Sequence, residues 1–266
     1  MVRRPLGNHH DGPDTLLVTS DTTRTERVAA ETENAIENLR ELVAGVQVVL
    51  WDFDGPICRL FAGHSAVVVA KDLVEWLAGQ GLRGLLTEEE REHPDPMAVL
   101  YAVHRRHPRS DLVTELEERL TQQELKAVGT AMPTAFADPL IRTWLAVGAR
   151  FAVTTNNSPR TVREYLADRD LTSCFDPHIY GRTLDLSLLK PHPYCLERAL
   201  RAMGVAASSA LMIGDSPADG EAARQAGVPF LGYARNEEKV ERLREAGAAC
   251  VVDSFEPVLR ALKGQA

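Results

Sequence analysis

Five short apolar runs, separated by helical stretches, constrain the fold of this chain more than any other feature. They have strand length, are rich in β-branched residues and are nearly uninterrupted by polar residues. A strand of this kind is buried on both faces, which is typical of a parallel sheet covered by helices. The runs occupy residues 46–51, 150–154, 210–213, 228–231 and 249–252. The sequence therefore predicts an α/β fold with a doubly wound parallel sheet.

A long helical segment separates the first two runs. About 80 residues lie there, whereas a connection within an α/β unit normally takes far fewer. Helical patterns cover residues 67–77, 97–104 and 112–128. The first of them opens with Val67, Val68 and Val69, which we predict to be core residues. We therefore predict an inserted all-helical domain. The predicted boundaries are 58–137 for this domain, and 46–57 with 138–266 for the sheet core.

Residues 1–45 precede the predicted sheet. Gly, Pro, Asp, Thr and His dominate residues 1–24 without periodicity, so this stretch is predicted to be a mobile leader. From Val28 to Val43 apolar residues recur at helical spacing, and Gly45 stands where a helix commonly ends. We expect this helix to pack against the body of the protein.

Composition and charge exclude several classes of function. The chain has 266 residues and a formal net charge of −8, which argues against a nucleic acid or an anionic membrane as partner. No stretch reaches the roughly 20 apolar residues of a membrane span, and the first residues lack the apolar core of a signal peptide. The four cysteines form no CxxC pair, so neither a zinc cluster nor a disulfide framework is indicated. We expect a cytoplasmic protein with reduced cysteines.

Two carboxylates follow the first apolar run. Asp52 and Asp54 lie on the same side of the extended chain, because side chains alternate with a period of two, and Gly55 then allows a turn. Two carboxylates this close need a cation between them or a shared proton. On its own this pair is equally compatible with a solvated turn. Because ligands bind at the carboxyl ends of parallel strands, the other strand ends decide between these interpretations.

Polar residues suited to an anion follow the second run and precede a later helix. Thr155 and Asn156 lie just ahead of Ser158 and the helix that it is placed to cap. Backbone N–H groups and the Thr155 hydroxyl at such a position suit an anion. Lys190 precedes a Pro-His-Pro segment and an amphipathic helix. The alternatives are a plain capped turn at the first segment and a surface charge at the second.

A further carboxylate, Asp215, follows the third run. Ser216 is placed to cap the next helix, and Asp219 is placed to complete a capping box with it. Asp215 has no comparable local role. Mg²⁺ is usually held by one or two carboxylates with water and substrate phosphate. Asp52, Asp54 and Asp215 supply such a set.

These four segments, in this order, resemble the motifs of the haloacid dehalogenase superfamily of phosphohydrolases. The resemblance is to phosphoglycolate-phosphatase-like members with a helical cap inserted after the first motif, and it begins at about residue 46. The matching positions are Asp52 with Asp54, Thr155, Lys190, and Asp215 with Asp219. Pro56 departs from the pattern, since Gly55 is usually followed by threonine. The resemblance implies a Rossmann-like sheet, an aspartyl-phosphate intermediate and Mg²⁺ dependence.

The resemblance also implies roles for the site residues. Asp52 is expected to attack phosphorus, and Asp54 to protonate the leaving oxygen and then deprotonate water. The expected phosphate ligands are Thr155, Asn156 and Lys190, and the expected metal ligands are Asp52, Asp54 and Asp215, with Asp219 supporting them. Dehalogenases as a class lack the second carboxylate of the first motif, so Asp54 argues for phosphoryl chemistry.

The predicted function is therefore Mg²⁺-dependent hydrolysis of a small phosphorylated metabolite. Two alternatives stay open on the sequence: a phosphomutase of the β-phosphoglucomutase type, and a non-catalytic binding module on the same scaffold. The core motifs do not separate phosphatase from mutase. They also leave open the substrate, the cap residues that contact it and the oligomeric state.

Overall fold

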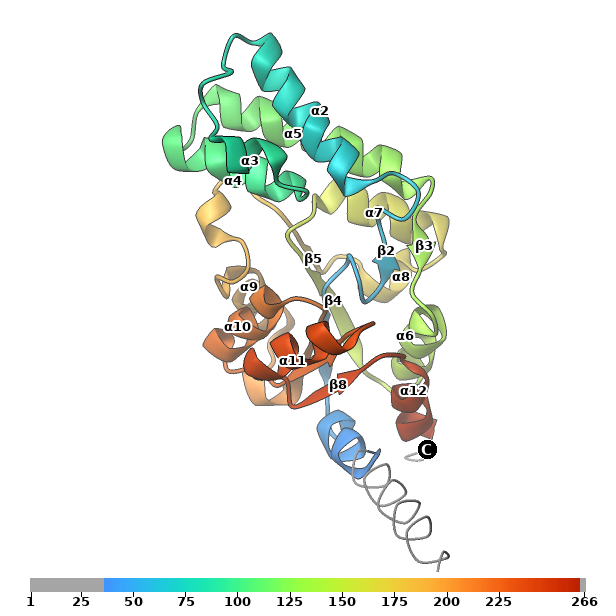
Figure 1. Ribbon diagram of the computed structural model, residues 1–266. Coiled ribbons are helices and arrows are strands. Elements are labelled where there is room, and N and C mark those ends of the chain that lie inside the picture. Colours follow the sequence, from blue (N-terminus) through green and yellow to red (C-terminus); the bar gives the residue numbers. More distant parts are fainter. Residues whose placement is uncertain (1–35, 264–266) are drawn as a thin grey trace, which may run out of the picture.

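A six-stranded parallel sheet forms the centre of the protein (Figure 1). The computed structural model describes residues 36–263. In spatial order the strands are β5 (Ile179–Tyr180), β4 (Arg150–Thr154), β1 (Val48–Trp51), β6 (Ala210–Gly214), β7 (Phe230–Tyr233) and β8 (Cys250–Val252). Each predicted apolar run contains or overlaps one of these strands. The two-residue edge strand β5 was not predicted, because so short a segment carries no periodicity.

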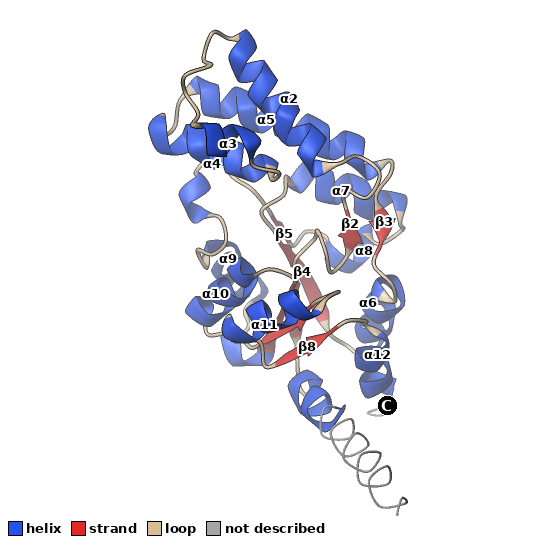
Figure 2. Ribbon diagram, in the orientation of Figure 1, coloured by secondary structure: helices blue, strands red, loops and turns tan. Residues whose placement is uncertain are grey.

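Helices cover both faces of the sheet (Figure 2). One face packs on α6 (Ala137–Ala146), α7 (Pro159–Asp168), α8 (Thr172–Phe175) and α12 (Glu256–Lys263). The other packs on α9 (Tyr194–Met203), α10 (Pro217–Ala226) and α11 (Glu237–Glu245). Two 3₁₀ turns complete this part, η1 (Leu186–Leu188) and η2 (Ala207–Ser209). The prediction of a doubly wound α/β sheet is confirmed.

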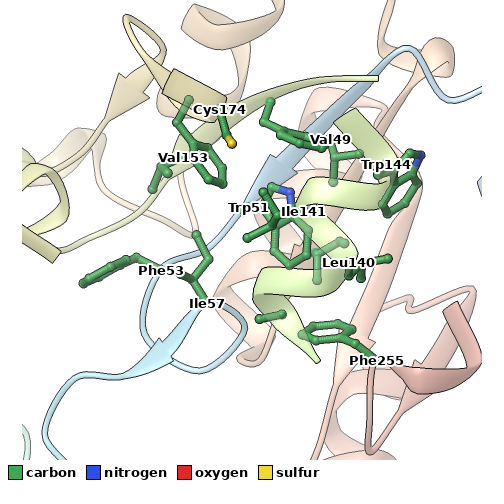
Figure 3. Close-up of a cluster of buried hydrophobic side chains, with 14 of the residues drawn as sticks. Val49, Trp51, Phe53, Ile57, Leu140, Ile141, Trp144, Val153, Cys174 and Phe255 are labelled. Carbon is green, nitrogen blue, oxygen red and sulfur yellow. The ribbon is translucent and has the colours of Figure 1, made fainter. Parts of the chain in front are cut away.

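The core on the first face fixes the end of the central strand. Trp51 of β1 is fully buried beside Ile141 of α6, and its ring meets that of Phe255 edge-on, with centroids 5.6 Å apart (Figure 3). Phe53 and Ile57 lie beyond the strand end and are also fully buried. Because these apolar side chains alternate with Asp52 and Asp54, their burial fixes the turn that carries both carboxylates.

A helical bundle lies between β1 and β4 in the sequence and over one end of the sheet in space (Figure 1). Its helices are α2 (Ala66–Gly79), α3 (Glu88–Glu92), α4 (Pro96–Arg106) and α5 (Asp111–Val128). The bundle has its own apolar core. The chain enters it through β2 (Cys58–Arg59) and leaves through β3 (Met132–Pro133), which pair antiparallel. The sequence did not predict this pair.

Helix α5 belongs to both parts of the molecule. Leu116 and Leu120 lie in the core of the helical bundle, whereas Ala127 and Val128, about two to three turns further on, lie in the core under the sheet. A single continuous helix therefore connects the two cores.

The prediction for the three valines at the start of α2 is wrong for two of them. Val67 and Val68 are 42% and 57% exposed, and only Val69 is buried. Successive residues of a helix point about 100° apart, so one face cannot bury all three. The buried face of α2 continues from Val69 to Leu73 and Leu77.

The described residues before the sheet are consistent with a packing helix. Residues 36–43 are helical, Leu39 and Val43 are buried against the sheet core, and Gly45 follows with a φ of +72°. The predicted leader and the first part of the predicted helix, at residues 1–35, lie outside the described residues.

The four cysteines all lie within the described residues. All four cysteines are unpaired; Cys58, Cys174 and Cys195 are buried and Cys250 is half-buried. Between residues 36 and 263, no helix combines the length and the apolar character needed to cross a membrane.

The sheet core and the helical bundle each contain a tryptophan, and the two side chains differ in burial. Trp144 of α6 is 2% exposed in the sheet core, whereas Trp76 of α2 is only partly buried against the bundle core. Trp144→Ala should lower the free energy of unfolding by about 3–5 kcal/mol, as expected for a large cavity. The matched change Trp76→Ala should cost clearly less. Urea unfolding followed by circular dichroism measures both; equal losses would contradict this account of the core.

Candidate active site

Three of the predicted site residues meet at one edge of the sheet. Asp52, Thr155 and Asp215 directly follow β1, β4 and β6, and β1 pairs with both other strands. The chain first builds strands on one side of β1 and then on the other, so this edge is the switch point of the topology, where α/β sheets bind ligands. A cavity of about 380 Å³ lies here, between the strand ends and the helical bundle.

Lys190 lies at the floor of this cavity and joins three segments. Its Nζ donates to Asp52 Oδ1 at 2.8 Å and to the Thr154 carbonyl oxygen at 2.7 Å, and it also donates to Asp219. The side chain is 3% exposed, which excludes the surface-charge interpretation. Burial alone would lower the pKa of Lys190, but the Asp219 and Asp52 carboxylates raise it. The ammonium group is therefore charged, with all its donors on internal acceptors.

Asp52 and Asp215 are held in an environment that resists ionisation. Burial, with the charges of Asp219 and Asp215, raises the pKa of Asp52 to about 7 although Lys190 opposes the shift. Burial likewise raises the pKa of Asp215 to about 6 against the effect of Lys239. A bound cation would favour the ionised forms of such groups.

The carboxylates fit a divalent metal ion. Carboxylate oxygens of Asp52, Asp215 and Asp219 lie within 4.8 Å of one another. Asp219 is already engaged through both oxygens: Oδ1 accepts from Lys190, and Oδ2 accepts from the Ser216 N–H and hydroxyl at 3.0 and 2.7 Å. Asp52 and Asp215 each keep one oxygen that no hydrogen bond reaches within residues 36–263. Two carboxylates with phosphate and water are the usual Mg²⁺ environment.

Asp54 is oriented differently from this group. Its Oδ1 accepts a hydrogen bond from the Leu60 N–H at 2.9 Å, and it is not a member of the group of three. Burial raises the pKa of Asp54 to about 6, although the Leu60 N–H opposes the shift. A carboxyl group with a pKa near neutrality is suited to exchange a proton with a bound reactant.

The turn after Asp54 depends on Gly55 and tolerates Pro56. Gly55 has a φ of +114°, and a Cβ there would lie 2.3 Å from Asp215 Cγ, so no other residue fits. The turn is closed by the Gly55 N–H, which donates to the Cys58 carbonyl oxygen, and by the Thr134 hydroxyl, which donates to the Gly55 carbonyl oxygen at 2.5 Å. Neither bond needs a donor from position 56, which explains why proline is accommodated.

The polar loop after β4 is tied to Lys190. The Asn156 amide donates to the Lys190 carbonyl oxygen at 3.0 Å and accepts from its N–H at 2.9 Å. The Thr155 hydroxyl donates to Asn157 Oδ1 at 3.0 Å and accepts from the Asn157 N–H. Ser158 caps α7 as predicted. Thr155 and Asn156 thus line the cavity with their side chains in local bonds, and their loop holds a fixed position relative to Lys190.

A buried ion pair holds the same loop from the side of the helical bundle. Arg182, which follows β5, is fully buried and donates to Glu124 of α5 at 2.7 Å, to Glu117 at 3.0 Å and to the Asn156 carbonyl oxygen at 3.0 Å. Glu124 also accepts from the Ser158 N–H at 2.9 Å. A carboxylate of the bundle therefore occupies the N-terminus of α7, where a helix favours an anion.

Sequence reasoning did not find Arg182, Glu124 or Lys239. Lys239 of α11 forms an ion pair with Asp215, yet seven of the nine residues of this helix are charged, a composition typical of a solvated helix. Glu117 and Glu124 are seven residues apart on α5, a spacing that places them on one helix face. This pair of glutamates on one face of α5 was the only sign in the sequence of a buried ion pair. Their partner Arg182 lies about 60 residues away, in a segment without a motif.

Fold and site together define a doubly wound α/β enzyme with a carboxylate and lysine centre at its strand ends. The model of the haloacid dehalogenase-like hydrolases matches residues 15–227. The chain therefore belongs to the haloacid dehalogenase-like hydrolase family, as its motifs predicted.

Known proteins similar to this chain include phosphatases. A phosphoglycolate phosphatase of Rhodospirillum rubrum is 36% identical over 133 residues, which cover 48% of this chain and 52% of that protein. This chain thus spans about half the length of that relative. A phosphoglycolate phosphatase of Pseudomonas savastanoi pv. phaseolicola is 27% identical over 233 residues, covering 84% of this chain and 83% of the relative.

A solved structure shows the same fold. CbbY from Rhodobacter sphaeroides, in complex with phosphate, superposes with a TM-score of 0.58 and 21% identity. The superposition covers 82% of this chain and 99% of the CbbY chain. At this level of identity the likeness establishes the fold.

The Arg182–Glu124 pair should contribute strongly to stability. Glu124→Gln leaves the buried Arg182 charge with reduced compensation, and breaking a buried pair costs about 3 kcal/mol or more. Glu118→Gln on the same helix is the matched control, because Glu118 pairs with Arg160 and both side chains are more than half exposed. That change should cost below about 1 kcal/mol. Urea unfolding of the two variants tests this, and similar losses would contradict it.

The raised pKa of Asp54 predicts a pH-dependent stability difference. Its folded-state pKa of about 6 exceeds the ordinary 3.8, so the folded protein binds more protons in this window and stability falls as pH rises through it. Asp54→Asn removes this loss and keeps an acceptor for Leu60. In the presence of EDTA, the melting temperature of the variant should exceed that of the parent above about pH 6, and the difference should shrink toward about pH 4. A difference independent of pH would refute the shift.

Proposed function

We propose that this protein is a Mg²⁺-dependent phosphatase that hydrolyses a small phosphorylated metabolite through a phosphoryl group carried on Asp52. The observation that carries the proposal is the buried Lys190–Asp52 contact of 2.8 Å at the floor of a cavity. It holds one Asp52 oxygen in place beside a positive charge, where a phosphoryl group would be drawn. The family and the names of the two phosphatase relatives support the same reaction.

Asp52 and Asp54 divide the chemistry between them. A carboxylate oxygen of Asp52 forms a bond to phosphorus while the bond from phosphorus to the leaving oxygen breaks, and Asp54 delivers its proton to that oxygen. Asp54 then takes a proton from water, whose oxygen attacks the phosphorus. Inorganic phosphate leaves and the Asp52 carboxylate is restored. The Asp54 pKa of about 6 suits both directions of proton transfer.

The remaining residues bind the phosphoryl group and orient it. Lys190 supplies positive charge to its oxygens, and the Thr155–Asn156 loop places hydroxyl and N–H groups beside Lys190. Asn156 contributes by holding this loop to the Lys190 backbone. Asp219 positions Lys190 and the start of α10.

Asp52 and Asp215 would hold the Mg²⁺ ion. When bound, the ion offsets the negative charge of the phosphoryl oxygens and of the carboxylates. The predicted third ligand, Asp54, has one oxygen on the Leu60 N–H and stands apart from the other carboxylates. This arrangement favours an acid–base role for its side chain.

The helical bundle serves as the cap of the site in this proposal. Residues of α4 and α5 line the cavity opposite the strand ends, and the pair β2–β3 connects the bundle to the sheet. For the cap and the core we propose the same boundaries as the sequence analysis. The unpaired cysteines are consistent with the proposed cytoplasmic location.

Release of inorganic phosphate from p-nitrophenyl phosphate tests the proposal. Asp52→Asn should abolish Mg²⁺-dependent release, and Asp54→Asn should reduce it by about 100-fold or more, because general acid–base catalysis typically contributes that much. EDTA should abolish release by the parent protein. The matched control Asp168→Asn changes an exposed aspartate at the end of α7 and should leave the rate unchanged.

Undiminished release by Asp52→Asn would refute the assignment. Free phosphate as the product also separates hydrolysis from a phosphomutase reaction, which returns the phosphoryl group to the substrate.

A further inference from the structure

The wall of the active-site cavity opposite the strand ends comes from the start of α4. Asp95, Pro96, Met97 and Tyr101 line it, together with Phe61 ahead of the helical bundle. This wall faces the side on which the leaving group of a substrate would lie, because the phosphoryl group is held by residues of the strand ends. Its chemistry therefore selects the leaving group.

The wall offers no positive charge. Lys190 is the one lysine or arginine that lines the cavity within residues 36–263, and its three donors already face internal acceptors. The guanidinium of Arg182 reaches the Asn156 carbonyl oxygen, but its side chain is fully buried and neutralised by Glu117 and Glu124. An anionic leaving group would therefore find no unpaired cation there.

Asp95 adds a negative charge to this wall. It caps α4, its Oδ1 accepts from the Met97 N–H at 2.8 Å, and no ion pair compensates it in the described part of the chain. Tyr101 lies one turn beyond Met97 on the same face of α4. Burial and the Asp95 charge raise the pKa of Tyr101 to about 12, so its hydroxyl keeps its proton at neutral pH. The wall thus presents a carboxylate acceptor and a hydroxyl beside apolar surface.

We infer that the substrate is the phosphate ester of a small alcohol or amino alcohol whose leaving group carries hydrogen-bond donors and no negative charge. Asp95 and Tyr101 are its specificity-determining residues. A leaving group with a carboxylate, such as glycolate, would place a second anion beside Asp95 without a cationic partner, and like charges side by side repel. Hydroxyl or ammonium donors would instead bind to Asp95. This inference rests on the proposed phosphatase function.

Three phosphate esters of equal chain length test the inference directly. The leaving group carries a carboxylate in glycolate phosphate, is neutral in ethylene glycol monophosphate and carries an ammonium group in ethanolamine phosphate. With Mg²⁺ present, kcat/KM for the neutral and ammonium esters should exceed that for glycolate phosphate by about tenfold or more.

Asp95→Asn keeps a good helix cap while removing the charge. It should reduce the preference for ethanolamine phosphate over glycolate phosphate severalfold. Asp185→Asn is the matched control, because Asp185 also caps a helical turn but does not line the cavity. Its ratio of kcat/KM values should equal that of the parent.

Hydrolysis of p-nitrophenyl phosphate, run in parallel, tests the phosphatase function separately from the substrate class. A protein that cleaves p-nitrophenyl phosphate but prefers glycolate phosphate, or cleaves none of the three esters, overturns the inferred substrate class and leaves the phosphatase function intact. An unchanged preference in Asp95→Asn overturns the role of Asp95. Failure to cleave any of the four compounds overturns the proposed function itself.

Discussion

The Lys190 ammonium group is the interaction on which the site depends. A buried cation is costly unless each donor finds an acceptor, and here the acceptors come from the ends of β1 and β4 and from the start of α10. Asn156 adds a fourth link by holding the backbone of Lys190. The strand order of the sheet brings these segments to one edge, and Lys190 fixes their relative positions there.

Burying these charged groups together has an energetic cost, which the raised pKa values of the surrounding acidic groups reflect. Asp52, Asp54 and Asp215 all have raised pKa values, mainly because of burial, and the positive charges of Lys190 and Lys239 offset only part of that effect. Such a cluster does not stabilise the free protein. It keeps the carboxyl groups ready for a cation and for proton transfer, in line with the usual trade between stability and function at an active site.

The strand ends were predictable from the sequence, because near-continuous apolar runs mark buried strands and the residue after each run must lie at the same edge. Ser216 and Asp219 were placed correctly in their capping box for a similar reason, since that motif is local. Partners distant in sequence were not predictable. Arg182, Glu124 and Lys239 look like surface charges until the fold buries or pairs them. The position of Tyr101 at the cavity likewise follows only from the packing of α4 within the helical bundle.

Helix α5 has a consequence for how separable the two parts of this enzyme are. Its first turns complete the core of the helical bundle, and its last turn completes the core under the sheet. Between them, Glu124 accepts from the Ser158 N–H at the start of α7 and pairs with Arg182. The bundle is inserted in sequence, yet it is not a detachable module. A chimaera that took its bundle from a relative would have to carry over a matching carboxylate at this position. Without that carboxylate, the loop after β4 would lose the contacts that Glu124 makes to it directly through the Ser158 N–H and indirectly through Arg182.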